Sequence, residues 1–197
     1  MTTTTRSMPR VSSSTLSMWI VSAITIVALL LGVALKNGVE NQTRPFDHAG
    51  VTARIPAGWI VQSGIVGEQT VFTAHDPFDA NLTYTASLVP TTADIKPSDL
   101  AFTFNLQRGQ ELTLFRTLDQ SQEKINGRDV LRIHYAYVDP NSQNTLPVVV
   151  EGVEYIYLSQ PNALIIAMED ETSQFSSALP DFVRFLGTVN YPAGGNQ

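Results

Sequence analysis

The sequence predicts an α+β domain, an antiparallel sheet covered by two helices, preceded by one transmembrane helix. Three observations support this fold class. An uncharged apolar run extends from Met18 to Leu35, short β-rich segments alternate with Pro, Gly and Asn turns, and two later segments carry apolar residues at helical spacing. The chain has 197 residues, 43% of them hydrophobic, which is enough for one core of single-domain size.

The N-terminal part predicts a membrane anchor. Residues 1–17 are rich in Thr and Ser, and we expect a disordered cytoplasmic tail. The run from Met18 to Leu35 nearly crosses a hydrocarbon core of about 30 Å. A cleaved signal peptide is the alternative, with Gly32 and Ala34 before the cleavage site. We favour a retained signal anchor, because a cleaved apolar region usually has only about 7–15 residues.

Charge predicts the orientation and excludes several partners. The tail contains Arg6 and Arg10 and no acidic residue, which places the N-terminus in the cytoplasm and the C-terminal domain outside the cell membrane. From Pro45 onward there are 8 basic and 17 acidic side chains, a formal charge of −9. This charge argues against binding nucleic acid or anionic lipid headgroups. The chain has no cysteine, so disulfides, thiolate sites and a lipid-modified cysteine are excluded.

The folded domain is predicted over residues 46–191, between a polar stalk at 36–45 and a tail at 192–197. Its first half begins with alternating or β-rich segments separated by turn residues. The predicted strands are Val51–Ile55, Trp59–Val61, Thr70–Ala74 and Asn81–Val89.

A helix is predicted next. Ser98 and Asp99 are residues typical of a helix N-cap, and they follow Pro97. Apolar residues then recur near helical spacing at Leu100, Phe104, Leu112 and Phe115. A strand is expected over Thr117–Lys124, ending at a tight turn.

The second half predicts a three-stranded antiparallel meander over Arg128–Glu169. Thr172 or Ser173 then begins a final helix, in which Pro180 introduces a kink or marks the true start. Its apolar residues are Phe175, Leu179, Phe182, Val183 and Leu186.

Two short motifs resemble a known fold family. The sequence Ile55-Pro56-Ala57-Gly58-Trp59 follows the first strand, and Ile125-Asn126-Gly127-Arg128 leads into the meander. With the order of elements over Phe46–Tyr191, they resemble the PsbP-like fold of the photosystem II extrinsic protein, the DcrB-type envelope proteins and the Ran-binding Mog proteins. The resemblance implies non-enzymatic binding or accessory work at a membrane, and no functional residue is carried over. In physical terms, Trp59 is expected to plug one end of the sheet–helix core.

One turn is a weak candidate for a metal site. His75, Asp76 and Asp79 lie within five residues and offer nitrogen and oxygen ligands. An Asp/Pro turn with a solvated histidine is the favoured reading.

Four tyrosines are candidates for an interface. Tyr135 and Tyr137 alternate on one predicted strand, and Tyr155 and Tyr157 alternate on a neighbouring strand. They could form one aromatic patch, because tyrosine is enriched at protein interfaces. Packing in the core is the favoured alternative.

No catalytic residue is predicted. There is no Gly-x-Ser-x-Gly motif and no Gly-rich phosphate loop. Glu151 and Glu154 are expected on opposite strand faces, and the acidic run Glu169–Glu171 is expected to begin a helix. His134 is expected on the strand face opposite Ile133 and Tyr135, as an exposed or half-buried residue.

The function predicted is that of a membrane-anchored, non-enzymatic accessory or interaction subunit with a protein partner or membrane complex, and no cofactor is expected. A module that binds a small ligand or metal near His75 is the alternative, and a hydrolase comes third. An exposed apolar patch would favour the first class, and a pocket would favour the second.

Overall fold

The computed structural model describes residues 13–40, 42–65, 69–140 and 146–192. It forms two compact units, one containing helix α1 (Ser13–Glu40) and one beginning at Thr43. Most of the predicted N-terminal tail and all but the first residue of the predicted C-terminal tail lie outside the described residues.

Helix α1 contains the apolar run that the sequence analysis singled out. Its large apolar side chains are exposed, among them Trp19 at 74% and Leu30 at 64%. Within the described residues, no helix has the combined length and apolarity needed to cross a membrane. The helix is therefore confirmed, while the membrane span stays a prediction. The segment expected to form a stalk divides between the end of α1 and the first strand of the domain.

The domain from Thr43 contains nine strands and two helices among its described residues. The strands are β1 (Thr43–His48), β2 (Val51–Pro56), β3 (Ile60–Ser63), β4 (Thr70–His75), β5 (Thr83–Pro90), β6 (Thr113–Ile125), β7 (Arg128–Asp139), β8 (Val148–Ser159) and β9 (Asn162–Glu171). The helices are α2 (Pro97–Glu111) and α3 (Thr172–Leu186).

Seven strands form one antiparallel sheet in the order β3-β4-β5-β9-β8-β7-β6, and β1 pairs with β2 in a separate hairpin. Strands β7, β8 and β9 are the predicted meander. The α+β class and the two helices on an antiparallel sheet are therefore confirmed.

Two turns follow directly from their residues. Asn126 and Gly127 both have positive φ, 51° and 77°, which is the conformation of a two-residue hairpin turn and favours Asn-Gly. Gly58 has φ 92°, and the Trp59 N–H donates to the Pro56 carbonyl at 3.4 Å. Because a turn with positive φ at its third residue favours glycine, the Pro-Ala-Gly-Trp sequence is well suited to this position.

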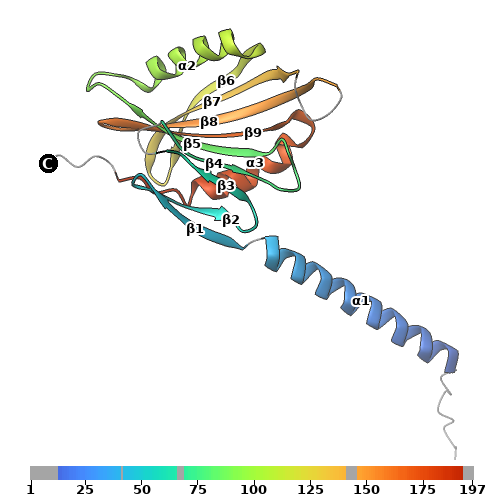
Figure 1. Cartoon of the computed structure of the whole chain (residues 1–197). Helices are drawn as coiled ribbons and strands as arrows, with labels where there is room; N and C mark the ends of the chain where they lie inside the picture. The colour runs from blue at the N-terminus through green and yellow to red at the C-terminus, as the bar shows by residue number, and fades with distance from the viewer. Residues whose placement is uncertain (1–12, 41, 66–68, 141–145, 193–197) are drawn as a thin grey trace, which may run out of the picture. The chain divides into compact units, whose positions relative to one another are not determined.

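The two helices lie on opposite faces of the seven-stranded sheet, and the β1–β2 hairpin lies on the face of α3 (Figure 1). We call these the α3 face and the α2 face. The α3 face buries a large aromatic core that includes Tyr84, Phe182 and Phe185. The α2 face buries a smaller core around Leu100, Ile133 and Tyr135.

Three local expectations are corrected by the structure. Helix α2 ends at Glu111, and Phe115 belongs to β6, where its ring lies 5.7 Å from that of Tyr135. The acidic run Glu169–Glu171 ends strand β9 and precedes α3. Trp59 is only partly buried and packs on Tyr84 with ring centres 4.5 Å apart, so it borders the α3-face core and does not plug it.

Candidate functional site

Each of the three candidate metal ligands at the turn after β4 has a contact within the protein. His75 Nδ1 lies 3.1 Å from the Thr83 hydroxyl, while Asp76 and Asp79 each accept a backbone N–H two residues ahead, from Phe78 at 2.8 Å and Asn81 at 3.1 Å. These contacts are typical of Asp-stabilised turns. In the described part of the chain, no group of three or more His, Asp and Glu side chains is arranged to hold a metal ion.

The four tyrosines do not form one patch. Tyr135 and Tyr137 lie on the α2 face, whereas Tyr155 and Tyr157 belong to the core of the α3 face. Tyr135, Tyr155 and Tyr157 are buried and Tyr137 is half-buried. The structure therefore corrects the single aromatic patch and places the tyrosines in two separate cores.

A buried ion pair lies beneath α2. The Arg108 guanidinium donates to the Glu154 carboxylate, whose side chain is fully buried, and it lies 4.6 Å above the centre of the Tyr135 ring. Burial opposes the positive charge, but the hydrogen bond and charge of Glu154 outweigh it and raise the pKa of Arg108. Glu154 Oε1 and Arg108 Nη1 are buried without a hydrogen-bond partner. Removing either member of the pair would therefore leave the charge of the other one buried without a partner.

Two tyrosines extend this polar group along the sheet. The Tyr135 hydroxyl donates to Glu169 at 2.7 Å, and the Tyr137 hydroxyl donates to the same carboxylate at 3.1 Å. Burial and the charge of Glu169 raise the pKa of both tyrosines, so both remain protonated donors at neutral pH. Gly152 faces Tyr135 across β7 and β8, and a Cβ there would come within 2.3 Å of the ring. Only glycine leaves room for this ring.

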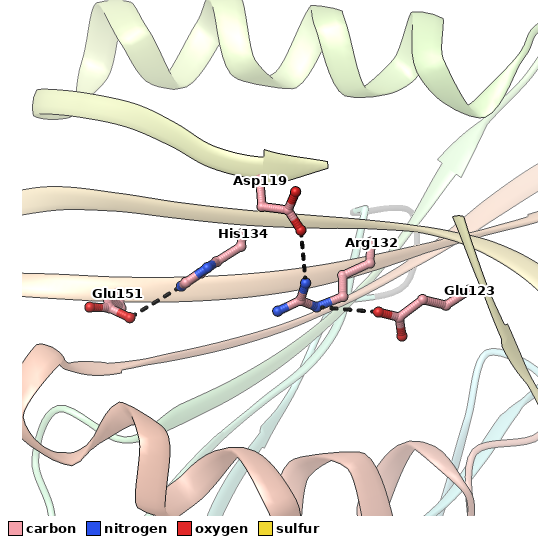
Figure 2. Close-up of polar contacts among 5 residues, drawn as sticks. All are labelled: Asp119, Glu123, Arg132, His134 and Glu151. Carbon is pink, nitrogen blue, oxygen red and sulfur yellow. Dashed lines mark hydrogen bonds and ion pairs between the residues drawn. The ribbon is translucent and has the colours of Figure 1, made fainter. Parts of the chain in front are cut away.

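A second polar group lies on the α3 face of β6, β7 and β8 (Figure 2). Arg132 lies between Asp119 and Glu123 at 3.2 and 3.7 Å, and His134 Nε2 lies 3.1 Å from Glu151. The His134 ring also stacks on Phe175 of α3, with ring centres 5.1 Å apart. This position confirms that His134 is half-buried on the face opposite Ile133 and Tyr135.

The His134–Glu151 pair has the composition of a base and its orienting acid. Nucleophilic catalysis also requires a hydroxyl in contact with the base. In the described part of the chain, no Ser or Thr hydroxyl forms a hydrogen bond with His134. The pair instead links β7 to β8, and the stacking of His134 on Phe175 links β7 to α3.

Exposed apolar side chains gather on α2 and β6. Phe102 and Leu106 are one helical turn apart on α2 and are 69% and 56% exposed. Leu114 and Leu118 are 73% and 52% exposed, and each lies in one of the two register shifts of β6 against β7. A β-bulge redirects a side chain out of the regular alternation. The two bulges therefore turn leucines toward solvent, and Leu114 adopts a positive φ of 54° to do so.

These four exposed side chains come from two adjacent elements, and we call them together the α2–β6 surface. The start of α2, at Lys96–Ser98, borders the same hollow as Gln120–Gln122 of β6, and the end of α2 leads directly into Thr113. Helix α2 therefore runs antiparallel to β6 and lies beside it (Figure 1).

Comparison with solved structures identifies the fold. The solution structure of cyanobacterial PsbP (CyanoP) from Synechocystis matches with a TM-score of 0.60 at 8% identity, over 76% of this chain and 92% of that chain. The domain has a PsbP-like fold. The resemblance seen in the sequence is therefore confirmed at the level of the fold.

Two further solved structures match with lower TM-scores. The Ran-binding protein MOG1P of Saccharomyces cerevisiae matches with a TM-score of 0.46 at 13% identity, over 77% of this chain and 86% of that chain. LpqN of Mycobacterium tuberculosis, described as involved in cell envelope biogenesis, matches with a TM-score of 0.45 at 17% identity, over 76% and 91%. No family model and no curated protein sequence matches this chain.

Proposed function

We propose that this chain is a non-enzymatic interaction subunit, and that its PsbP-like domain binds a protein partner through the α2–β6 surface. The observation that carries the proposal is the grouping of Phe102, Leu106, Leu114 and Leu118, all more than half exposed, on two adjacent elements. Exposed apolar groups of this kind mark protein–protein contact sites. The formal charge of −9 from Pro45 onward favours a partner with basic side chains around an apolar centre.

We further propose that α1 holds the domain at the extracytoplasmic side of a membrane. The uncharged run from Met18 to Leu35, its exposed apolar side chains and the basic residues Arg6 and Arg10 support this orientation. Protease added to intact spheroplasts should digest the domain from Phe46 onward. Protection of the domain would reject the orientation, and release of a soluble form starting near Leu35 would indicate cleavage.

The partner surface is tested by site-specific photocrosslinking of the full chain in its native membranes. A photoreactive residue at position 102, 106, 114 or 118 should give an adduct of one shared mass. The matched control is Phe78, which is 97% exposed but lies outside the α2–β6 surface, and it should give no such adduct. Leu106→Asp combined with Leu118→Asp should abolish the adduct formed from position 102.

The outcomes distinguish the occupants of the surface. An adduct of twice the chain mass would indicate a second copy, and an adduct with lipid alone would overturn the protein-partner proposal. Equal labelling from Phe78 and from the α2–β6 surface would overturn it as well.

The alternative of a metal-binding module is the weaker proposal, because Asp76 and Asp79 accept backbone N–H groups of the turn and His75 contacts Thr83 of β5. A hydrolase is likewise the weaker proposal, because among the described residues no Ser or Thr hydroxyl forms a hydrogen bond with His134.

A further inference from the structure

A pocket of about 310 Å³ opens beside the hairpin turn that joins β6 to β7. Its walls come from the Asn126 turn, from β8 and β9, and from the segment Gly187–Tyr191 that follows α3. Two hydrogen bonds hold this segment, from Asn126 Nδ2 to the Gly187 carbonyl at 3.1 Å and from Arg128 Nη1 to the Tyr191 carbonyl at 2.7 Å. The pocket is thus bounded by fixed backbone, at the small end of the range for ligand sites.

The pocket contains a polar group that the protein does not satisfy. Tyr157 lines it and is only 7% exposed, and its hydroxyl is buried without a hydrogen-bond partner. A buried hydroxyl without a partner costs about 1–3 kcal/mol, so a ligand that supplied a partner would be stabilised there. Burial raises the pKa of Tyr157, and therefore the hydroxyl is a donor at neutral pH.

A cation lines the same pocket as this hydroxyl. Burial raises the pKa of Tyr157, and the charge of Arg128 in the same pocket acts in the opposite direction. In the described part of the chain, no carboxylate forms an ion pair with Arg128, although acidic residues outnumber basic ones in this domain. A guanidinium with an adjacent hydroxyl donor matches a carboxylate, which accepts two hydrogen bonds at once.

The remaining walls are apolar. Ile125, Leu164 and Val189 line the pocket beside the two donors. This combination of a cationic end and an apolar wall fits an amphipathic organic acid of modest size.

We propose that this pocket binds small monocarboxylic acids, with the carboxylate held by Arg128 and the Tyr157 hydroxyl and the apolar body against Leu164 and Val189. The proposal is independent of the partner surface, since the two sites share no residue.

The test uses the full chain, labelled with ¹⁵N and kept in solution by a non-ionic detergent. Acetate, butyrate, benzoate and 3-phenylpropanoate are titrated up to about 10 mM, because an affinity near 1 mM corresponds to about 4 kcal/mol. We expect saturable shifts of the amides of Asn126–Arg128 and Gly187–Asn190, larger for the two aromatic acids. The neutral analogue 3-phenylpropanol should bind at least about tenfold more weakly than 3-phenylpropanoate.

Variants separate specific binding from general adsorption. Arg128→Gln and Tyr157→Phe should each weaken binding of 3-phenylpropanoate about tenfold, since each removes a hydrogen bond to a charged group. Tyr157→Phe removes one oxygen from the pocket and keeps its shape, so it remains informative if Arg128→Gln fails to fold. The control Arg184→Gln removes an exposed arginine of α3 that pairs with Asp181, and it should leave binding unchanged.

Two results would overturn the proposal. One is the absence of any shift in the pocket amides with all four acids. The other is binding that persists unchanged in both Arg128→Gln and Tyr157→Phe.

Discussion

The two faces of the sheet differ in the size of their buried cores and in the kinds of side chain that these cores contain. Among the described residues, 19 buried apolar residues form the core of the α3 face, and 8 form that of the α2 face. The larger core contains a connected group of rings, in which Tyr84 contacts Phe182 at 4.9 Å and Phe185 at 5.0 Å. The smaller core instead contains the ion pair of Arg108 and Glu154.

From this difference we expect the α3 face to contribute most to stability and the α2 face to contribute to recognition. Burial of apolar area is the largest favourable contribution to folding, and aromatic side chains bury the most, so the α3 face should supply most of the free energy of unfolding. A buried ion pair adds little net stability but fixes the position of the groups that it joins. The pair therefore fixes the position of α2 on the sheet, and Phe102 and Leu106 of the same helix are exposed.

The largest expected effect is that of Phe182→Ala on the α3 face. Phe182 is fully buried, and truncation of such a ring costs about 3–5 kcal/mol. Denaturant titration followed by circular dichroism should show this loss. Leu100→Ala, at 6% exposure on the α2 face, should cost less, and Val183→Ala, at 47% exposure beside Phe182, should cost least. If Leu100→Ala costs as much as Phe182→Ala, the proposed contrast between the two faces is wrong.

The next effect concerns the ion pair. Arg108→Met leaves Glu154 charged and buried without its partner, which costs about 3–5 kcal/mol for a fully buried pair. We expect about 2–3 kcal/mol because the Arg108 side chain keeps 20% exposure.

Replacing both members provides the control. The double variant Arg108→Met with Glu154→Met should recover most of the loss, since no charge is then left in the core. A double variant as unstable as Arg108→Met alone would show that the helix, and not the charge, was disturbed.

A smaller effect is expected from the buried carboxyl group of Asp170 on the α3 face. Asp170 is fully buried, one of its oxygens has no hydrogen-bond partner, and burial together with Asp79 raises its pKa from 3.8 to about 6. The folded protein therefore holds a proton on Asp170 between these two pH values, where the unfolded chain has lost it. The contribution of Asp170 to stability should thus fall as the pH rises from 3.8 to about 6 and stay level above that.

Asp170→Asn tests this pH dependence. At pH 7 the variant should be more stable than the wild type by about 1–2 kcal/mol, because no buried carboxylate must ionise. At pH 4 the two proteins should have nearly the same free energy of unfolding. A parallel pH dependence in both proteins would assign the effect to another group.

The smallest effect is expected outside both cores. Asp76→Ala removes the acceptor for the Phe78 N–H in the turn after β4, and His75→Ala removes a contact with Thr83. Surface changes of this kind usually stay within about 0.5 kcal/mol. Elemental analysis of the purified protein before and after substitution provides the second measurement. If the purified protein contains a metal that is lost on either substitution, the turn after β4 is a metal site after all.

Much of the fold is predictable because its signals are local. The Asn126-Gly127 turn, the alternating strands and the final helix each depend on neighbouring residues only. Helix α2 was predicted too long because Phe115 continues the spacing of Leu100 and Phe104 by coincidence, although it lies in β6.

The candidate sites depend on pairing between distant strands, which a single sequence does not reveal. The register of β7 and β8 places Tyr135 opposite Gly152 and Arg132 opposite Tyr155, and this register decides which face each tyrosine occupies. A signal for the buried pair does exist, because Arg108 follows Phe104 by one helical turn on the inward side of α2. Its partner Glu154 stands between apolar residues of a central strand.

The bulges of β6 also bear on how the domain behaves at high concentration. Strand β6 is an edge of the sheet, and a long regular edge would accept a strand from a neighbouring molecule. Register shifts between Thr113 and Arg116 and between Thr117 and Asp119 interrupt the regular row of backbone donors and acceptors. The same irregularities that expose two leucines therefore disfavour pairing of β6 with a strand of another molecule. Another protein would then contact β6 through its side chains and not through its backbone.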